Sequence, residues 1–158
     1  MRVEYINPFV ESAITVLREM ASVEFARGDL ALRSYPLLTK GVVIVIGVAG
    51  QIEGRVLYDM DMKTALKISG LMMGGEIITE YDEMVASALA ELGNIISGNA
   101  VSQLNDLGFE FDITPPTLFV GNNLEMSSPN METQTLVIPL LQPEVGEIII
   151  NVALREKN

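Results

Sequence analysis

The stretch GVVIVIGVAGQIEGRVLYD, residues 41–59, decides the fold. Two runs rich in β-branched residues, Gly41 to Val48 and Ile52 to Asp59, are joined by Ala49-Gly50-Gln51, a pattern typical of a β-hairpin. Thr133–Leu141 and Glu147–Leu154 form a second such pair near the other end of the chain. Pro139 in this second pair has no N–H to donate, which predicts that its strand lies at a sheet edge or is bulged.

The two hairpins align without a gap when the sequence is shifted by 92 residues. The shift pairs Ile44-Val45-Ile46 with Leu136-Val137-Ile138, and Gly54 with Gly146. Each hairpin also follows a helical segment, which indicates a duplicated helix-plus-hairpin unit. The alternative is that any two buried hairpins share β-branched residues. A duplication predicts an α/β (α+β) fold, in which two units build one antiparallel-rich sheet with the long helices packed on it.

Capping signals mark where the helical segments begin. Asn7 is expected to be the N-cap of the first helix, with Pro8 at its first helical position. Asp59-Met60-Asp61 is interpreted as a strand end followed by an N-cap, rather than as a metal site. Thr79-Glu80-Tyr81-Asp82 resembles a capping box that opens the longest helix. In chain order, the predicted elements are a helix from Asn7 to about Val23, a loop at Arg27-Gly28-Asp29, the first hairpin, a helix from Met62 to Met73, a helix of about 26 residues ending at Leu107, a strand at Thr117–Val120, a loop at 121–130 and the second hairpin.

The composition restricts the chemistry open to this chain. Its 158 residues suit a single domain spanning residues 1–158. It contains no His and no Cys, which excludes a Ser-His-Asp triad, a thiolate nucleophile and the commonest zinc ligands. The net charge of −11 argues against a nucleic-acid backbone or an anionic membrane as partner. The longest apolar run, Val42 to Ile46, is too short to span a bilayer and the amino terminus has no signal-peptide core, so a cytoplasmic protein is expected.

Polar residues recur on one face of the longest predicted helix. Ser87, Glu91 and Asn94 stand at i, i+4 and i+7, and Gly98 falls in the same stripe. The apolar residues of the segment gather on the opposite side: Val85, Leu89, Leu92 and Ile96. A carboxylate and a carboxamide one turn apart are therefore held away from the core, where they can reach another molecule. Taken alone, the stripe also fits the solvated side of an amphipathic helix.

Together with its neighbours, this stripe resembles the active helix of the CheC/CheX/FliY phosphatases, which hydrolyse the aspartyl phosphate of CheY-type response regulators. The family pattern is Asp or Ser, three residues, Glu, two residues, Asn and a later Pro, matched here by Ser87, Glu91, Asn94 and Pro115-Pro116. Further segments resemble the CheX branch: Ile46–Gly54, Ile113–Thr117, and Ala65-Leu66-Lys67 leading to Met72-Met73-Gly74-Gly75.

The resemblance implies a mechanism that needs neither His nor Cys. Asn94 would position the attacking water and Glu91 would dock on a cation of the regulator, with Ser87 and Gly98 as further contact positions. Mg²⁺ is expected on the regulator, with no cofactor or metal on this chain. Gly93 and Gly98 each cost a helix ~1 kcal/mol against Ala, and we expect a closely approaching partner backbone to be the reason for them.

The resemblance also has implications for the oligomeric state and for the number of active motifs in the chain. Relatives of the CheX branch are homodimers, and edge strands are expected to pair across a two-fold axis. Family relatives can carry the motif in both halves, and Glu4 and Asn7 are the candidates in the first half. Because Pro8 makes Asn7 a helix cap, Glu4 is not expected one helical turn below it, which predicts one working site. The alternatives are a non-catalytic flagellar-switch-type module that binds the phosphorylated regulator, and a scaffold with no phospho-dependence.

Overall fold

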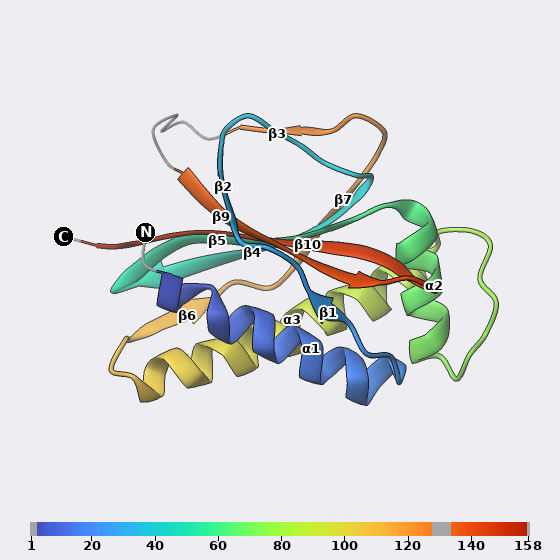
Figure 1. The fold of residues 1–158 in the computed structure, drawn as a ribbon, viewed down its shortest axis with the longest axis horizontal. Coiled ribbons are helices and arrows are strands. Elements are labelled where there is room, and N and C mark those ends of the chain that lie inside the picture. The colour runs from blue at the N-terminus through green and yellow to red at the C-terminus, as the bar shows by residue number, and fades with distance from the viewer. Residues whose placement is uncertain (1–2, 128–133, 158) are drawn as a thin grey trace.

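The computed structural model describes residues 3–127 and 134–157 of the chain. Helices α1 and α3 lie side by side across one face of an antiparallel sheet, and α2 stands at one end of this helical layer (Figure 1). In chain order, the elements are η1 (Val3–Tyr5), α1 (Asn7–Ala21), β1 (Ala26–Arg27), β2 (Ala31–Ser34), β3 (Leu37–Leu38), β4 (Val42–Gly50), β5 (Ile52–Met60), α2 (Met62–Met72), α3 (Glu83–Asp106), β6 (Phe111–Ile113), β7 (Thr117–Val120), β8 (Glu125–Met126), β9 (Gln134–Gln142) and β10 (Gly146–Glu156).

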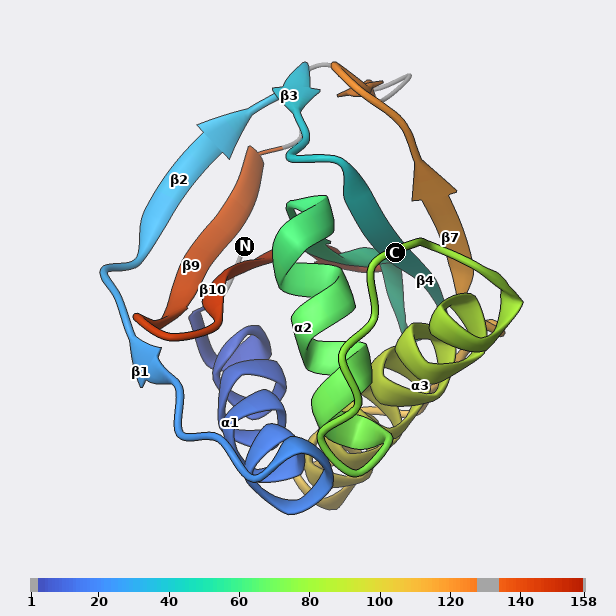
Figure 2. The ribbon, with the colours of Figure 1, turned by 90° about the vertical axis from the view of Figure 1, so that its right-hand side faces the viewer.

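The main sheet has eight strands, and its central part has the order β1-β9-β10-β5-β4-β6. β2 also pairs with β9, and β7 also pairs with β4. Figure 2 shows β2 and β7 rising on opposite sides of the sheet toward the small β3–β8 pair, so that these strands form an arch over the face without helices. The mixed fold with an antiparallel sheet and packed helices confirms the predicted fold class.

The two halves of the chain repeat the same arrangement. A shift of 92 residues carries β4, Val42–Gly50, onto the bounds of β9, Gln134–Gln142. Tyr58 pairs with Ile150, which stands 92 residues later, so equivalent residues of the two halves are paired near one end of the β5–β10 ladder. The strands after each helix are exchanged between the halves, because β1 and β2 pair with β9 while β6 and β7 pair with β4. The predicted helix-plus-hairpin duplication is therefore confirmed.

The main core lies between the helices and the central strands. Alternate residues of each central strand face the helices, as the two-residue period of a strand requires. The fully buried members of this set include Ile44, Ile46, Tyr58 and Met60 on the first hairpin, Ile138, Leu140, Ile150 and Val152 on the second, and Phe9, Leu17, Leu89 and Leu92 on the helices.

Of the two alternatives predicted for Pro139, the sheet edge is wrong, and the bulge lies in the neighbouring chain, where residues 28–30 stand opposite 138–139. β9 has β10 on one side and β1 and β2 on the other. Pro139 lies opposite the break between β1 and β2, where the Gly28 N–H donates to its carbonyl oxygen at 2.8 Å. A proline is tolerated there because the neighbouring chain is interrupted where its missing N–H would point. The loop predicted at 27–29 is correspondingly shorter, since Arg27 belongs to β1.

The start of α1 differs from the prediction. Asn7 is the first residue of the helix rather than its N-cap, and the cap position is held by Ile6, which has helical dihedral angles and no side-chain cap. The preceding turn η1 is also helical, and the Ile6 N–H donates to the Val3 carbonyl at 3.1 Å. Glu4 therefore does lie about one helical turn before Asn7. The helix ends at Ala21, before the predicted Val23, because Ser22 adopts a left-handed conformation with φ of 55°.

The other two helices show where capping signals are reliable. Asp61 is the N-cap of α2, as predicted, and accepts a hydrogen bond from the Thr64 N–H at 2.8 Å. The predicted capping box at 79–82 is wrong, because Asp82 itself caps α3 and accepts from the Val85 N–H at 2.9 Å. The helix therefore begins at Glu83 and runs for 24 residues, slightly shorter than expected.

The strands agree with the prediction in number of hairpins but not in every boundary. β4 continues through Gly50, because Ala49 and Gly50 pair with β6, and only Gln51 is left in the turn. The predicted loop at 121–130 contains β8, and its last three residues, like Thr133 of the second hairpin, lie outside the described residues. β7 has the predicted bounds. Among the described helices, none is both long and apolar enough to cross a membrane.

Candidate active site

A shallow groove of about 500 Å³ runs between α3 and the segment that connects β6 to β7. Ser87, Glu91 and Asn94 line it from the helix, and Thr114-Pro115-Pro116 line it from the opposite side. The structure thus brings together the helical stripe and the proline pair of the sequence motif. Gly98 lies further along α3 and does not line this groove.

Packing on the buried side of α3 fixes which face points into the groove. Gly93 lies directly against β4, where a Cβ atom would come within 2.7 Å of Ile44 Cγ2. One turn later, the Ser97 hydroxyl is 2.7 Å from the Tyr58 hydroxyl of β5, and both groups are buried. Because Gly93 and Ser97 hold the inner face of the helix on the first hairpin, Asn94 and Glu91 are directed outward.

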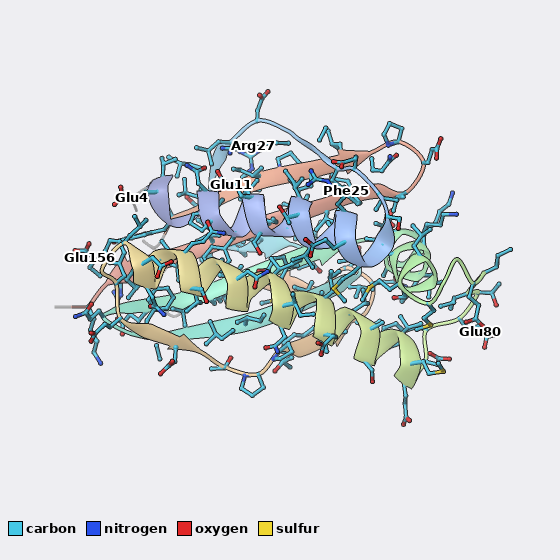
Figure 3. The ribbon with its side chains drawn as sticks, turned by 90° about the horizontal axis from the view of Figure 1, so that it is seen from below. Glu4, Glu11, Phe25, Arg27, Glu80 and Glu156 are labelled. Carbon is cyan, nitrogen blue, oxygen red and sulfur yellow. The ribbon has the colours of Figure 1, made fainter. Side chains whose placement is uncertain are left out.

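A second contact holds α3 against α1, the helix beside it (Figure 3). The Ser12 hydroxyl of α1 donates a hydrogen bond to the Ile96 carbonyl of α3 at 2.9 Å. This hydrogen bond joins a side chain of α1 to a fixed point on the backbone of α3. It therefore restricts sliding of α3 along its axis relative to α1. The site is therefore built on a helix that is fixed from two directions.

The opposite wall of the groove is attached to the same strand as α3. Thr114 Oγ1 accepts a hydrogen bond from the Gly47 N–H at 2.8 Å, and the Thr114 N–H donates to the Gly47 carbonyl at 2.9 Å. Gly47 permits this approach, because a Cβ there would lie 3.0 Å from the Thr114 methyl group. Two segments that resemble the CheX branch, 46–54 and 113–117, are thus in direct contact. The sequence did not predict that Thr114 fixes this wall of the groove. The only indication was that Thr114 lies within the segment 113–117, which resembles the CheX branch.

Glu91 and Asn94 are exposed and free to bind a partner. Within residues 3–127 and 134–157, neither side chain makes a hydrogen bond or an ion pair. A carboxamide both donates and accepts hydrogen bonds, and a carboxylate accepts several. The pair can therefore hold a water molecule and a cationic group one helical turn apart, without a general base.

Gly93 has a different explanation from the one its sequence suggested. It was expected to allow close approach of a partner backbone, but it is buried and its missing side chain makes room for Ile44. Gly98 differs, since nothing lies within 4 Å of the position its Cβ would occupy. The helix-propensity cost at Gly93 is thus offset by packing inside this chain.

The candidate second motif lies at the start of α1. Glu4 is exposed in η1 at the end of the molecule labelled in Figure 3, and Asn7 is half-buried. Asn7 Oδ1 is buried and has no hydrogen-bond partner among the residues that the structure describes. The segment equivalent to the Thr114-Pro115-Pro116 wall is Gly28-Asp29-Leu30, because the Gly28–Pro139 hydrogen bond repeats the Thr114–Gly47 bond after the exchange of halves. This half therefore lacks the threonine hydroxyl and the proline pair.

The acidic side chains of the described residues are dispersed rather than clustered. In the two described ranges, no group of three or more Asp or Glu residues is placed to hold a metal ion. The carboxylate of the groove, Glu91, has an amide and a hydroxyl beside it, whereas Mg²⁺ prefers several oxygens in an octahedral array.

The duplicated fold, with a helix that carries Glu and Asn beside a proline wall, defines the class of CheC/CheX-like proteins. Residues 42–141 match the family described as chemotaxis phosphatase CheX. The CheY-P phosphatase CheX of Thermotoga maritima is 35% identical over 128 residues, which cover 81% of this chain and 83% of that protein. The chain belongs to the chemotaxis phosphatase CheX family.

Solved structures agree over nearly the whole chain. The crystal structure of a CheC-like superfamily protein from Shewanella sp. PV-4 has a TM-score of 0.88 at 30% identity, and the match covers 98% of this chain and 99% of that one. The crystal structure of a CheX-CheY-BeF₃-Mg²⁺ complex from Borrelia burgdorferi matches with a TM-score of 0.81 at 40% identity, covering 98% of this chain and 100% of that one.

Proposed function

We propose that this chain, a phosphatase by family, hydrolyses the aspartyl phosphate of a CheY-type response regulator, with Asn94 positioning the attacking water and Glu91 docking on a cation of the regulator. One observation carries the assignment of residues. Glu91 and Asn94 project one turn apart into an open groove, and neither has a partner in the described part of the chain. The Thermotoga relative is a CheY-P phosphatase by name, and the Borrelia relative is a CheX in complex with CheY, which supports the choice of substrate.

The chemistry requires little from the phosphatase itself. Phosphoryl transfer passes through a loose transition state, so the attacking water needs correct placement more than early deprotonation. The Asn94 carboxamide oxygen accepts a hydrogen bond from that water, and its N–H donates a hydrogen bond to a phosphoryl oxygen. Mg²⁺ is expected to come with the regulator, and the complex of the Borrelia relative with CheY contains BeF₃ and Mg²⁺. Chelating the metal should therefore stop the reaction, although the isolated chain should show no tight Mg²⁺ site.

Glu91 binds the regulator through its negative charge and takes no part in bond breaking. It lies one turn before Asn94 and carries a carboxylate into the same groove. An ammonium group of the regulator placed against it would make a charge-assisted hydrogen bond, which is stronger than a neutral one. This contact fixes the orientation in which Asn94 reaches the phosphoryl group.

The test is the decay of a phosphorylated CheY-type regulator, timed with and without this chain. Asn94→Ala should remove most of the acceleration, by two or more orders of magnitude, because a positioned water is lost. Asn99→Ala is the matched control, since Asn99 is also exposed on α3 but does not line the groove. A near wild-type rate for Asn94→Ala would assign the chemistry to other residues. Binding of the phosphorylated regulator without faster decay would instead support the flagellar-switch-type module.

The chain is also expected to form a homodimer through the outer edge of β7. This strand pairs with β4 on one side, and its sequence Thr117-Leu118-Phe119-Val120 contains no charged residue. Phe119 and Val120 are 46% and 41% exposed. An uncharged edge strand with exposed apolar side chains is a template for pairing with a second copy. Sedimentation of the purified chain tests this assembly.

A further inference from the structure

A second cavity, separate from the groove on α3, lies under the arch on the face of the sheet without helices (Figure 2). We call it the arch cavity; its volume is about 270 Å³. Arg33, Ser34 and Leu37 line it from β2 and β3, and Leu57, Asp59 and Asn151 line it from the central strands. Nothing in the proposed phosphatase reaction uses these residues.

The floor of the arch cavity carries two buried polar side chains. Asp59 on β5 is 5% exposed, and Asn151 on the neighbouring strand β10 is 7% exposed. Both point away from the helical core, because their neighbours Tyr58 and Ile150 face it. Asp59 and Asn151 stand 92 residues apart, so they are equivalent positions of the duplication, placed around the paired Tyr58 and Ile150. The duplication thus puts a carboxylate and a carboxamide together in one cavity.

The hydrogen bonds inside the protein leave part of the hydrogen-bonding capacity of Asp59 and Asn151 unused. Asp59 Oδ1 accepts the Lys40 backbone N–H at 2.9 Å. The Lys40 ammonium group turns instead to Glu147 Oε1, at 2.9 Å. Among the residues of the described ranges, Asp59 has no ion pair and the Asn151 amide has no hydrogen bond. The Asn151 carboxamide therefore faces the cavity beside a carboxylate whose charge is met by backbone N–H groups alone.

Burial of this carboxylate is costly. Desolvation and, to a lesser extent, the Glu147 charge raise the pKa of Asp59 from 3.8 to about 6, although the Lys40 N–H, the Lys40 charge and the Met60 N–H act in the opposite direction. A buried charge needs a counter-charge or several hydrogen bonds to offset its desolvation. A cation in the cavity would supply both to Asp59, and the Asn151 oxygen could accept a further hydrogen bond from it.

We propose that the arch cavity binds a small molecule that carries a primary ammonium group on a short aliphatic body. The ammonium group sits between Asp59 and Asn151, and the body lies against Leu37, Leu57 and Ile149. An anionic ligand is disfavoured because the floor carries the buried carboxylate, while the Arg33 guanidinium, which would attract an anion, is exposed to solvent. The proposal does not depend on the phosphatase activity, and its test has a different readout.

The probe is isopentylamine, with its neutral isostere isopentanol as the reference ligand. The amine should shift the NMR signals of the Asn151 side-chain NH₂ and the Lys40 backbone N–H in a saturable way, and the alcohol should not. Asp59→Asn should weaken binding of the amine by about tenfold or more, because a charge-assisted hydrogen bond is lost while the acceptor for the Lys40 N–H is kept. Glu11→Gln is the matched control, since it removes the same charge from an exposed position of α1 in the helical layer (Figure 3).

A third variant tests the cavity independently, in case Asp59→Asn does not fold. Ile149→Phe adds volume to the cavity from a half-buried position of β10, without touching either polar group, and should also weaken binding of the amine. No saturable shift with isopentylamine would mean that water alone fills the cavity, and would overturn the proposal. Equal shifts with isopentanol, or unchanged amine binding by Asp59→Asn or Ile149→Phe, would overturn it as well.

Discussion

The hydrogen bond between Ser97 and Tyr58 is the internal anchor of α3 whose contribution can be measured most directly. The two hydroxyl oxygens are 2.7 Å apart, and the residues are 0% and 2% exposed. Ser97→Ala would leave the Tyr58 hydroxyl buried without a partner, which costs about 1–3 kcal/mol. We therefore expect this variant to lower the free energy of unfolding by about 2 kcal/mol.

The opposite substitution should cost less, for a reason specific to helices. After Tyr58→Phe, the Ser97 hydroxyl can turn back to the carbonyl of Gly93 four residues earlier, as the Ser69 hydroxyl does to the Ala65 carbonyl at 2.8 Å. Tyr58→Phe should thus cost about 1 kcal/mol. The double variant leaves no unpaired hydroxyl, so it should be more stable than Ser97→Ala alone.

The assay is urea unfolding of the wild type, the two single variants and the double variant, with the slope m compared across all four. The four free energies form a double-mutant cycle, and a favourable coupling between Ser97 and Tyr58 is expected. If the costs of the two single substitutions simply add in the double variant, the hydroxyls do not depend on each other. The reasoning about how α3 is anchored would then be refuted.

Other predictions concern charge and assembly. Glu91→Gln should weaken binding of the phosphorylated regulator by about tenfold and slow its decay, since a charge-assisted hydrogen bond becomes neutral; equal affinity at low salt would remove Glu91 from the mechanism. Because the pKa of Asp59 is raised from 3.8 to about 6 in the folded chain, its contribution to stability falls as pH rises through that interval. The free energy of unfolding of the wild type minus that of Asp59→Asn should therefore drop by up to roughly 3 kcal/mol between pH 4 and pH 7 in urea titrations without added ligand, and a flat difference would contradict the buried charge. Phe119→Lys should convert a dimer to monomers in sedimentation experiments, and an unchanged dimer would exclude the β7 edge.

Local patterns predicted the elements that are long and regular. The period of α3 places Ser87, Glu91 and Asn94 outside and Val85, Leu89 and Leu92 inside, as the structure shows. The two hairpins were predicted for the same reason, because each buries an unbroken run of β-branched residues on its own. The repeat of 92 residues then followed from the sequence without any knowledge of contacts.

Features that depend on distant partners could not be predicted in this way. β1, β2 and β6 are two to four residues long and exist as strands because β9 and β4 supply their hydrogen bonds. The Thr114–Gly47 contact joins residues 67 positions apart. Capping failed at Asn7 and at Thr79 for a related reason: each has a residue type that caps helices, but the surrounding packing sets where the helix starts.

Comparison of the two duplicated halves explains why they are not equivalent as sites. Aligning Glu4 and Asn7 with Glu91 and Asn94 places Ile6 where α3 has Gly93, and Val10 where α3 has Ser97. Ile6 and Val10 are completely buried, so α1 fills its interface with apolar side chains. On α3 the same positions hold a glycine that lets the helix lie against Ile44 and a serine that bonds Tyr58.

This difference in packing affects the outer face as well. A helix that rests on Ile6 cannot lie as close to its strand as one that rests on Gly93, where even a single Cβ would come within 2.7 Å of the strand's side chain. Asn7 is half-buried and its side-chain oxygen is enclosed. Asn94 is exposed in a groove whose far wall is hydrogen-bonded to β4, the strand on which α3 also packs. We therefore expect one working site per chain. The first half then serves mainly as the support on which the second half holds Glu91 and Asn94.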